Sequence, residues 1–284
     1  MAYLKLNVFH WHLTDNPGWR IEIKKYPKLA SIGSQFAPLP EQKGYYTQDQ
    51  IREIVEYARR RYIHIMPEIE IPGHSMAAIR SYPEMTCFGE TLGNGPRIFC
   101  GGKEEVYEFL TNVLEEVCEM FPYEYIHIGG DEASKGGWEK CPHCQAKIEE
   151  RGLENEHELQ LYMTNRLADF LKSKGRYAVC WDDVIAQPGP AMRDNVVVHW
   201  WNYRGRKDKC LKLAAEQGHR VLLSPNYFTY LNFPVVAPWR GYDQWRSFDI
   251  QKAYQENPAN LNEDRQEYRS SVLGISACLW TDYN

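Results

Sequence analysis

Hydrophobic and polar positions along the chain follow two periods, one typical of strands and the other of helices. Short apolar runs rich in β-branched and aromatic residues predict strands, and apolar residues that recur every three or four positions predict amphipathic helices. Strands are predicted at residues 3–12, 62–71, 123–130, 176–181, 196–201, 220–224 and 272–280. Helices are predicted after residue 47 and at 103–121, 156–174 and 207–217, with an irregular, partly helical stretch at 247–267.

Two local signals mark where the predicted helices begin and end. The sequence Thr47-Gln48-Asp49-Gln50 fits a capping box, in which the first and fourth residues exchange hydrogen bonds with each other's backbone. Behind it, apolar residues recur at helical spacing from Ile51 to Ala58. Gly175 and Gly218 each follow a predicted helix, and a left-handed glycine commonly ends a helix.

The alternation of strands and helices predicts a parallel sheet. Polar or aromatic clusters follow several strands, at residues 10–12, 68–70, 130–132, 181–183, 199–201 and 280–282. Chemistry that recurs at the C-terminal ends of strands is typical of a (β/α) barrel, whereas an open doubly wound sheet gathers it at one switch point. The sequence therefore predicts one α/β domain over residues 1–284, a TIM-type (β/α)8 barrel with one strand fewer than closure requires.

The composition is that of an ordinary globular protein, because a hydrophobic fraction of 43% is enough to bury a core. The net charge of −5 argues against nucleic acid as a partner, and the basic run at 59–61 is interpreted as a solvated helix end. No apolar run is long enough to cross a bilayer, so no membrane partner is expected. Residues 1–12 lack the pattern of a signal peptide. Localisation stays open between the cytoplasm and the periplasm or secretion.

The eight cysteines show no clear disulfide framework, which slightly favours a reducing compartment. The only CxxC motif is Cys141-Pro142-His143-Cys144, and no second pair of ligands accompanies it at a spacing typical of a zinc ribbon. A local disulfide or two free thiols is therefore favoured over a structural metal. The aromatic residues, 13% of the chain, serve either as core or as the flat apolar faces that a sugar cleft needs.

The segment His127-Ile128-Gly129-Gly130-Asp131-Glu132 offers two adjacent carboxylates. Neighbouring side chains of a strand point to opposite faces, so Asp131 and Glu132 can both reach one pocket only where the strand ends. The two glycines permit that change of direction, and two close carboxylates are expected to split into an acid and a base. The alternative is that Asp131 caps a following helix, which leaves the glycine pair and Glu132 unexplained.

Histidines accompany the carboxylates. His10 and His12 lie on the same side of a predicted strand, as zinc ligands of some hydrolases do, with Asp15, His74, His127 or His199 as further ligands. Hydrogen-bonded polar residues without a metal are favoured, because no HExxH or HxxEH pattern supports zinc. In Pro67–His74, a turn at Pro72 and Gly73 is expected to aim His74 across the mouth of the site, where it can titrate.

Several segments together resemble glycoside hydrolase family 20, the β-N-acetylhexosaminidases. They are HWHLTD at 10–15 with GWR at 18–20, PEIEIPGH at 67–74 and HIGGDE at 127–132. Weaker matches lie at Gly175 and at residues 181–183, 228–231 and 279–281. The matches follow the order of the family and cover nearly the whole chain.

The resemblance implies a retaining, substrate-assisted mechanism, in which the carbonyl oxygen of the sugar's 2-acetamido group is the nucleophile and an oxazolinium intermediate forms. Glu132 would protonate the leaving oxygen and then activate water. Asp131 would accept the amide N–H and stabilise the positive charge. Tyr230 would hold the acetamido carbonyl, and Asp15 and His74 would form a relay that tunes Glu132.

The same resemblance implies three tryptophans around the acetamido group, Trp181, Trp201 and Trp280, with Trp201 chosen over its neighbour Trp200. It implies no metal and no cofactor. The expected ligand is a glycan or oligosaccharide that contains N-acetylhexosamine.

Some positions depart from the family pattern. Asn232 stands where an aspartate is usual beside the tyrosine, and Asp282 stands where a glutamate usually contacts sugar hydroxyls. The strand that begins at Tyr3 resembles the second barrel strand, so the first strand and its sugar-gripping arginine are expected to be missing, as is the last helix. An open sheet exposes two edges, which predicts poor stability or closure by a partner chain such as a second copy. A monomer that melts sharply would contradict this.

Three functions stay open on the sequence. The first is an exo-acting hexosaminidase that releases terminal N-acetylglucosamine or N-acetylgalactosamine. The second is a sugar-binding remnant without turnover, since the missing arginine supplies binding energy that catalysis uses. The third is a metal-dependent hydrolase built on His10, His12 and an acidic partner, which sensitivity to a chelator would favour.

Overall fold

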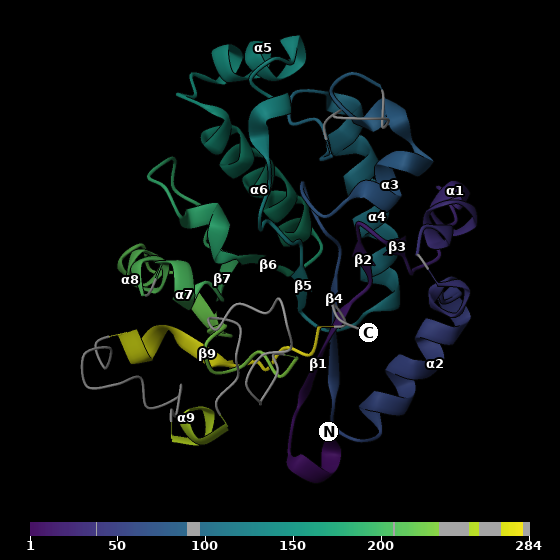
Figure 1. The fold of residues 1–284 in the computed structure, drawn as a ribbon, viewed down its shortest axis with the longest axis vertical. Helices are drawn as coiled ribbons and strands as arrows, with labels where there is room; N and C mark the ends of the chain where they lie inside the picture. The colour runs from purple at the N-terminus through teal and green to yellow at the C-terminus, as the bar shows by residue number, and fades with distance from the viewer. Residues whose placement is uncertain (38, 90–96, 207, 233–249, 256–267, 281–284) are drawn as a thin grey trace, which may run out of the picture. The chain divides into compact units, whose positions relative to one another are not determined.

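The computed structural model describes the chain except for residues 38, 90–96, 207, 233–249, 256–267 and 281–284 (Figure 1). The described residues fall into two compact units. The first comprises Met1–Cys180 with Gly189–Asn195, and the second comprises Trp181–Pro188 with Val196–Asn284. Each unit contains parallel strands together with the helices that connect them.

Four parallel strands form the sheet of the first unit, in the order β1-β4-β5-β6. His12 pairs with Glu68, and Glu68 pairs with His127. Directly paired residues of parallel strands present their side chains to the same face, so these three side chains gather at the C-terminal ends of the strands. The strands are β1 (Val8–His12), β4 (His64–Glu68), β5 (Tyr125–His127) and β6 (Tyr177–Trp181), whose last residue falls in the second unit.

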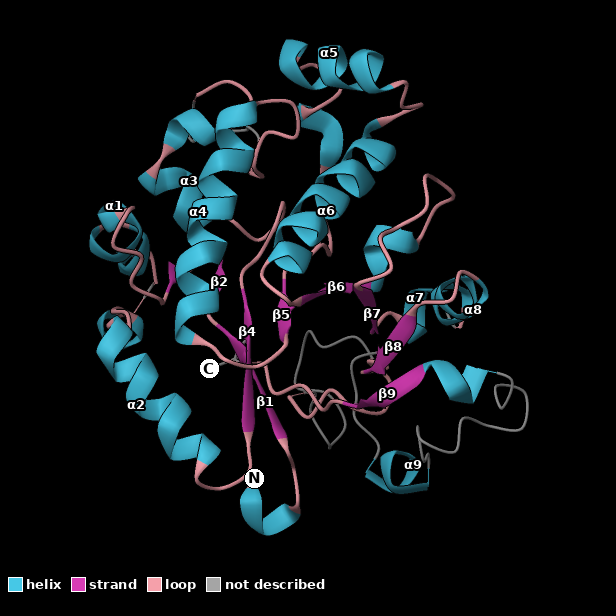
Figure 2. Ribbon diagram, turned by 180° about the vertical axis from the view of Figure 1, so that it is seen from behind, coloured by secondary structure: helices cyan, strands magenta, loops and turns pink. Residues whose placement is uncertain are grey.

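The helices of the first unit cover this sheet with the apolar faces that the sequence predicts. Figure 2 shows α4 (Glu104–Met120) beside α6 (Glu156–Ser173), and the two helices are in contact. The predicted apolar face of α4 is buried, at Val106, Phe109, Leu110, Val113, Leu114 and Val117. The remaining helices of this unit are α1 (Pro27–Ser31), α2 (Gln48–Arg59), α3 (Met76–Ser81) and α5 (Pro142–Arg151).

The predicted helix boundaries are confirmed at both signals. The Thr47 side chain accepts a hydrogen bond from the Gln50 backbone amide at 3.2 Å, and the Gln50 side chain accepts one from the Thr47 amide at 2.9 Å. Gly175, with a φ of 69°, follows α6, and Gly218, with a φ of 78°, follows α8 (Lys209–Glu216). Both glycines therefore adopt the left-handed conformation that was expected of them.

A short hairpin extends the chain beyond β1. It consists of β2 (Thr14–Asp15) and β3 (Gly18–Trp19), which are antiparallel. The Trp19 ring is buried and donates a hydrogen bond to the Ile21 carbonyl at 2.6 Å. The Arg20 guanidinium donates to the carbonyls of Ser34 and Gly44 at 2.8 and 2.9 Å. These contacts fix the hairpin, and with it Asp15.

The second unit contains the remaining strands, β7 (Val196–Trp200), β8 (Arg220–Leu223) and β9 (Val272–Ile275), in that order and parallel. Its helices are α7 (Tyr203–Arg206), α8 (Lys209–Glu216) and α9 (Ile250–Gln255), with a 3-10 turn at Asp182–Ile185. Seven parallel strands are thus found in the described chain, as predicted. Across the described residues of both units, no helix is long and apolar enough to cross a bilayer.

Some predicted boundaries are wrong. The strand predicted at 3–12 begins only at Val8, because Ala2–Leu4 forms a 3-10 turn and Lys5 has a left-handed φ of 61°. The strand predicted at 272–280 ends at Ile275, and Cys278 forms only an isolated bridge with Tyr230. Helices α1, α3 and α5 were not predicted, because α1 and α3 are short and α5 buries only Cys144 and Lys147, which gives no apolar period.

We expect the Thr47→Ala substitution to lower the free energy of unfolding by about 0.5–2 kcal/mol, because α2 loses the side chain that satisfies its first amides. Urea unfolding followed by tryptophan fluorescence measures this. The Thr47→Ser variant keeps the hydroxyl and should retain most of the stability. An equal loss in both variants would show that the methyl group of Thr47, and not the cap, is responsible.

Candidate active site

A fully buried carboxylate, Glu68, lies at the centre of the site in the first unit. Its Oε2 atom lies 2.8 Å from His10 Nε2 and 2.7 Å from His12 Nδ1, and its Oε1 atom lies 2.9 Å from His127 Nδ1. The two histidines of β1 reach it because they stand two positions apart on one face of the strand. His127 reaches it from the opposite neighbouring strand, β5.

The charges of this cluster follow from its burial and its contacts. Burial opposes ionisation of Glu68, but its interactions with the imidazoles of His127, His12 and His10 outweigh this and hold the pKa of Glu68 well below its usual range. Burial also opposes protonation of His12, yet the Glu68 charge and hydrogen bonds with Asp15 and Glu68 raise its pKa to about 10. Burial lowers the pKa of His127 to about 4. An ionised Glu68 therefore faces a cationic His12 and a neutral His127.

Glu70 is a second buried carboxylate in the same place, with the opposite protonation state. Burial raises its pKa well above the usual range, and the negative charges of Asp131 and Glu68 add to the shift. The Glu70 backbone amide donates to Thr14 Oγ1 at 2.8 Å. A Cβ atom at Gly129 would lie 2.1 Å from Glu70 Oε2. The absence of a side chain at Gly129 therefore leaves space for the Glu70 carboxylate.

His74 stands in the turn between β4 and α3, as predicted from Pro72 and Gly73. Its φ is 46°, a left-handed value that is uncommon for a residue with a side chain. A Cβ atom at Gly73 would lie 2.9 Å from the Asp131 carbonyl oxygen, so the turn packs directly against the loop that follows β5. This packing brings His74 to the two predicted carboxylates.

His74 joins the carboxylates of two separate loops. Its Nδ1 lies 3.0 Å from Asp15 Oδ1, while its Nε2 lies 3.3 Å from Asp131 Oδ2 and 3.4 Å from Glu132 Oε2. Asp15 also lies 3.4 Å from His12 Nε2. A continuous series of contacts therefore runs from Glu68 through His12, Asp15 and His74 to the carboxylate pair.

The electrostatics of this series favour an ion pair at its centre. Burial opposes protonation of His74, but hydrogen bonds with Asp15 and Glu132 and the charge of Asp131 raise its pKa to about 11. Burial likewise opposes ionisation of Asp15, and its hydrogen bonds with His12 and His74 overcome this and lower its pKa. At neutral pH, an anionic Asp15 therefore lies between two imidazolium rings.

Asp131 and Glu132 follow β5 by a change of backbone direction at Gly129 and Gly130, whose φ values are 67° and 112°. Glu132 itself has a φ of 47° and its side chain is 61% exposed, whereas that of Asp131 is 18% exposed. The next regular element is the 3-10 turn Lys135–Gly137, which begins after Ser134 and has no side-chain cap. Asp131 is thus not a helix cap, and the alternative interpretation of this residue is wrong.

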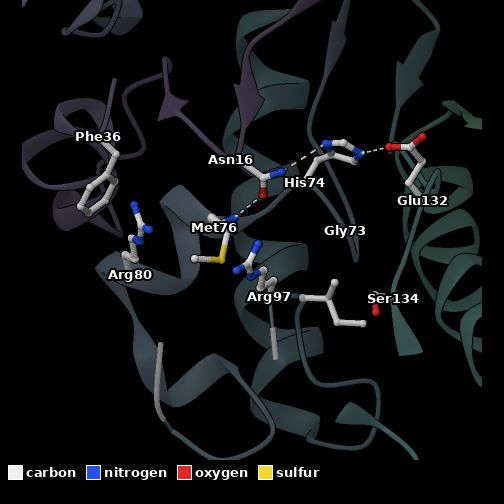
Figure 3. A pocket seen from close by; sticks show the side chains of 10 residues that line it. Asn16, Phe36, Gly73, His74, Met76, Arg80, Arg97, Glu132 and Ser134 are labelled. Atoms are coloured by element: carbon white, nitrogen blue, oxygen red, sulfur yellow. Dashed lines mark hydrogen bonds and ion pairs between the residues drawn. The ribbon is translucent and has the colours of Figure 1, made fainter. Parts of the chain in front are cut away.

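A cavity of about 800 Å³ opens beside Glu132. Figure 3 shows His74 between Asn16 and Glu132 at its edge, with Arg80 and Arg97 along another side. Asn16 Nδ2 lies 3.5 Å from His74 Nδ1, and Asn16 Oδ1 accepts from the Met76 amide at 3.3 Å. The lining residues are Asn16, Phe36, Gly73, His74, Met76, Arg80, Arg97, Ile98, Glu132 and Ser134.

The predicted aromatic residues gather in the second unit. Trp181 and Tyr230 are buried together with Cys278, and Trp201 and Trp280 pack against them. The Trp280 ring centroid lies 6.2 Å from those of both Trp181 and Tyr230, and Trp201 stacks on Tyr230 at 6.2 Å.

Trp201, and not Trp200, belongs to this aromatic cluster. The Trp201 indole donates to Asp183 Oδ2 at 2.7 Å, whereas Trp200 is fully buried and packs edge-on against Tyr203. The Arg206 guanidinium lies 2.9 Å from Asp183 Oδ2 and so helps to fix the residue that holds Trp201. Arg206 is a contributor that the sequence did not single out.

The structure thus brings four predicted residues together in the first unit, Asp15, His74, Asp131 and Glu132. In the second unit it brings together Trp181, Trp201, Tyr230 and Trp280. Asn232 lies partly buried two residues beyond Tyr230, and Asp282 lies outside the described residues. Sequence reasoning missed Asn16, Arg80 and Arg97, which are polar loop or helix residues without a motif of their own.

Several groups of described residues lie close enough to hold a metal ion. Three share histidines and carboxylates of the site, namely His10 with Glu68 and His127, His12 with Glu68 and Glu70, and His74 with Asp131 and Glu132. In the first two, Glu68 already accepts contacts from the imidazoles at 2.7–2.9 Å. A further group consists of four cysteines, Cys87, Cys100, Cys141 and Cys144.

Comparison with known proteins adds to this geometry. The family model for the catalytic domain of glycosyl hydrolase family 20 matches residues 1–284. The chain is 38% identical over 296 residues to a beta-hexosaminidase of Porphyromonas gingivalis, and the match covers 100% of this chain and 37% of that protein. A beta-hexosaminidase of Vibrio furnissii is 36% identical, with 99% of this chain and 48% of that protein covered. The chain therefore spans less than half the length of these curated relatives.

Solved structures show the same likeness. The beta-N-acetylhexosaminidase from Bacteroides fragilis has a TM-score of 0.93 at 48% identity, covering 100% of this chain and 56% of that one. The exo beta-N-acetylglucosaminidase from Vibrio harveyi, in complex with N-acetylglucosamine, has a TM-score of 0.84 at 33% identity, covering 99% and 46%. These likenesses confirm the predicted fold class, an α/β chain of the (β/α)8 barrel type.

We expect Asp15→Asn to lower the pKa of His74 from about 11 toward the ordinary value near 6.5, because the first favourable contact of the imidazolium is removed. Titration of the imidazole nitrogens by NMR measures this directly. His64, whose ring stacks on Tyr123 at 4.6 Å and which has no contact with Asp15, serves as the internal control.

The loss of stability caused by Asp15→Asn should depend on pH in a defined direction. Because the pKa of His74 is raised in the folded state, its ion pair contributes fully to stability below the pKa of the unfolded state, and the contribution is lost as the pH rises through the pKa of the folded state. The wild type should therefore exceed the variant most between about pH 5 and 6.5, and the difference should shrink toward pH 11. A difference that grows with pH would contradict the ion pair.

Proposed function

Because the chain belongs to glycosyl hydrolase family 20, we propose that it is the catalytic part of an exo-acting, retaining β-N-acetylhexosaminidase. Its substrate is a glycan or oligosaccharide with a terminal β-linked N-acetylglucosamine or N-acetylgalactosamine. The observation that carries the proposal is the pair Asp131 and Glu132, joined to one nitrogen of His74 at the exit of β5. The similar enzyme from Vibrio harveyi holds N-acetylglucosamine, which supports an acetamido sugar as substrate.

Glu132 acts as the general acid and then as the general base. It is the more exposed of the two carboxylates and lines the cavity, so a leaving group can approach it. In the first step its proton passes to the glycosidic oxygen while the bond from that oxygen to C1 breaks. The carboxylate that results lies 3.4 Å from the His74 imidazole, which is cationic and stabilises the new negative charge.

The nucleophile is the acetamido oxygen of the substrate, which bonds to C1 as the leaving group departs. Retaining glycosidases that use a carboxylate nucleophile place two carboxyl groups on either side of the scissile bond, about 5–5.5 Å apart. Asp131 and Glu132 lie closer together than this, because they have carboxylate oxygens within 4.8 Å of each other and within 3.4 Å of a single His74 nitrogen. This convergence supports a substrate that supplies its own nucleophile.

Asp131 orients that nucleophile by accepting the amide N–H, and its negative charge stabilises the oxazolinium ion. Water then attacks C1 and gives a proton to Glu132. The bond from C1 to the acetamido oxygen breaks, so the oxazolinium ring opens and Glu132 is again the protonated acid. His74 and Asp15 are positioning residues in this scheme, because they hold the carboxylates without contacting the sugar.

The aromatic residues of the second unit keep the roles that the family resemblance implies. Trp181, Trp201 and Trp280 offer flat apolar faces to the sugar and its acetyl group, and Tyr230 holds the acetamido carbonyl. Asn232 and Asp282 are assigned to substrate binding, and Asp282 takes the position that contacts sugar hydroxyls in the family pattern. The single-domain organisation and closure of the sheet by a second copy also stay predictions.

We expect Glu132→Gln to lower kcat/KM by about 10²–10⁴ on chitobiose, whose leaving sugar needs a proton. On a dinitrophenyl β-N-acetylglucosaminide the loss should be much smaller, because that leaving group departs without one. Asp131→Asn, the matched variant, should lose activity on both substrates to a similar extent. The plain β-glucoside, which lacks the acetamido group, should not be turned over by the wild type.

Two outcomes would count against this assignment. Equal losses on both leaving groups in Glu132→Gln would show that Glu132 is not the proton donor. Binding of N-acetylglucosamine without turnover by the folded wild-type chain would favour the sugar-binding remnant.

A further inference from the structure

Four cysteines that the proposed function does not use converge in the first unit. Cys87 follows the 3-10 turn Pro83–Met85, and Cys100 precedes α4, while Cys141 and Cys144 stand at the beginning of α5. Cys100, Cys141 and Cys144 are completely buried, and Cys87 is 5% exposed. The sequence offers no second cysteine pair at the spacing typical of a zinc ribbon, and the structure shows all eight cysteines as free thiols. Cys87 and Cys100 complete the set although they are not a CxxC pair.

The distances between the sulfur atoms fit a tetrahedral metal site. Cys87 Sγ lies 3.8 Å from Cys144 Sγ, and Cys100 Sγ lies 3.8 Å from Cys141 Sγ and 3.6 Å from Cys144 Sγ. All four sulfur atoms lie within 4.8 Å of one another. Zinc–sulfur bonds of about 2.3 Å require sulfur–sulfur edges of about 3.8 Å in a tetrahedron. We propose that Cys87, Cys100, Cys141 and Cys144 bind one zinc ion as a structural tetrathiolate site.

The arrangement suits zinc better than disulfides. A disulfide holds its two sulfur atoms about 2.05 Å apart and joins fixed pairs. Here Cys144 lies as near to Cys100 as to Cys87, and Cys100 lies nearly as near to Cys141 as to Cys144. Cys100 and Cys144 thus each have two sulfur neighbours at 3.6–3.8 Å, and all four sulfur atoms lie within 4.8 Å of one another, as the corners of a tetrahedron do. Four protonated thiols would have only weak hydrogen bonds to offer one another in a buried place.

The backbone around the cysteines is also shaped for such a site. A Cβ atom at Gly102 would lie 2.2 Å from the carbonyl carbon of His143 and 2.4 Å from the Cys144 nitrogen, so only glycine allows this approach. The two cysteine loops therefore pack backbone against backbone.

The metal would fix one wall of the cavity beside Glu132. Arg97 and Ile98 line that cavity and lead directly into Phe99 and Cys100. The Phe99 amide donates to the Pro72 carbonyl at 3.1 Å, and its carbonyl accepts from the Trp138 indole at 2.9 Å. Zinc would therefore hold this wall to α5. The assignment does not depend on the proposed reaction.

The test is metal content and coordination of the full chain. Elemental analysis by mass spectrometry should find about one zinc per purified chain. Cys144→Ser should reduce that content severely, whereas Cys118→Ser, which changes a half-buried cysteine of α4 outside the cluster, should leave it unchanged. Titration of the four thiols with a mercurial should release the zinc, detected with a chromogenic chelator.

Exchange with Co²⁺ keeps the test decisive if Cys144→Ser does not fold. The cobalt-loaded wild-type chain should show the intense visible bands of tetrahedral coordination and sulfur-to-cobalt charge transfer, and Cys118→Ser should show them unchanged. A folded wild-type chain with no metal and four free thiols, or with two disulfides by mass mapping, would overturn the proposal. Stoichiometric iron in place of zinc would overturn the choice of metal.

Discussion

The first unit depends on one interaction, the ionised carboxylate of Glu68 held among imidazoles from both neighbouring strands. A buried carboxylate is costly unless it is paired and hydrogen-bonded. Glu68 is fully buried and meets His10, His12 and His127 at 2.7–2.9 Å. The register of β4 with its neighbours β1 and β5 places these side chains next to one another. A shift of one residue in either strand would turn the imidazoles to the other face and leave the charge buried alone.

The rest of the site is arranged outward from this carboxylate by alternating charge. His12 is cationic between Glu68 and Asp15, and His74 is cationic between Asp15 and the pair Asp131 and Glu132. Glu70 lies farther from the His12 imidazole, at 3.9 Å, and burial together with the negative charges of Asp131 and Glu68 holds it neutral. The outermost residues are also strained. His74 and Glu132 have φ values of 46° and 47°, a conformation that costs about 1–2 kcal/mol for a residue with a side chain. The network therefore holds the groups that the proposed chemistry uses in positions the backbone alone would not favour.

Local signals in the sequence predicted much of this structure. The sequence showed the capping box at Thr47, the left-handed glycines that end two helices and the central residues of the strands. Each of these features depends on residues that are close in the sequence. The adjacency of Asp131 and Glu132 after two glycines also predicted a change of chain direction that lets both carboxylates reach one pocket. The central role of Glu68 was not predictable, because it depends on the pairing of β1, β4 and β5, which are far apart in the sequence. For the same reason Cys87 and Cys100 were not recognised as partners of the CxxC motif, and Arg97 was not recognised as part of the cavity.

The measurement that tests this account most directly is the stability of Glu68→Gln beside Glu70→Gln, by urea unfolding at pH 7. Glu68 is ionised and paired, so its neutral replacement should cost on the order of 3–5 kcal/mol. Glu70 is already neutral, so glutamine should change the free energy of unfolding by less than about 1 kcal/mol. A similar loss in the two variants would contradict the claim that a single ionised carboxylate organises the site.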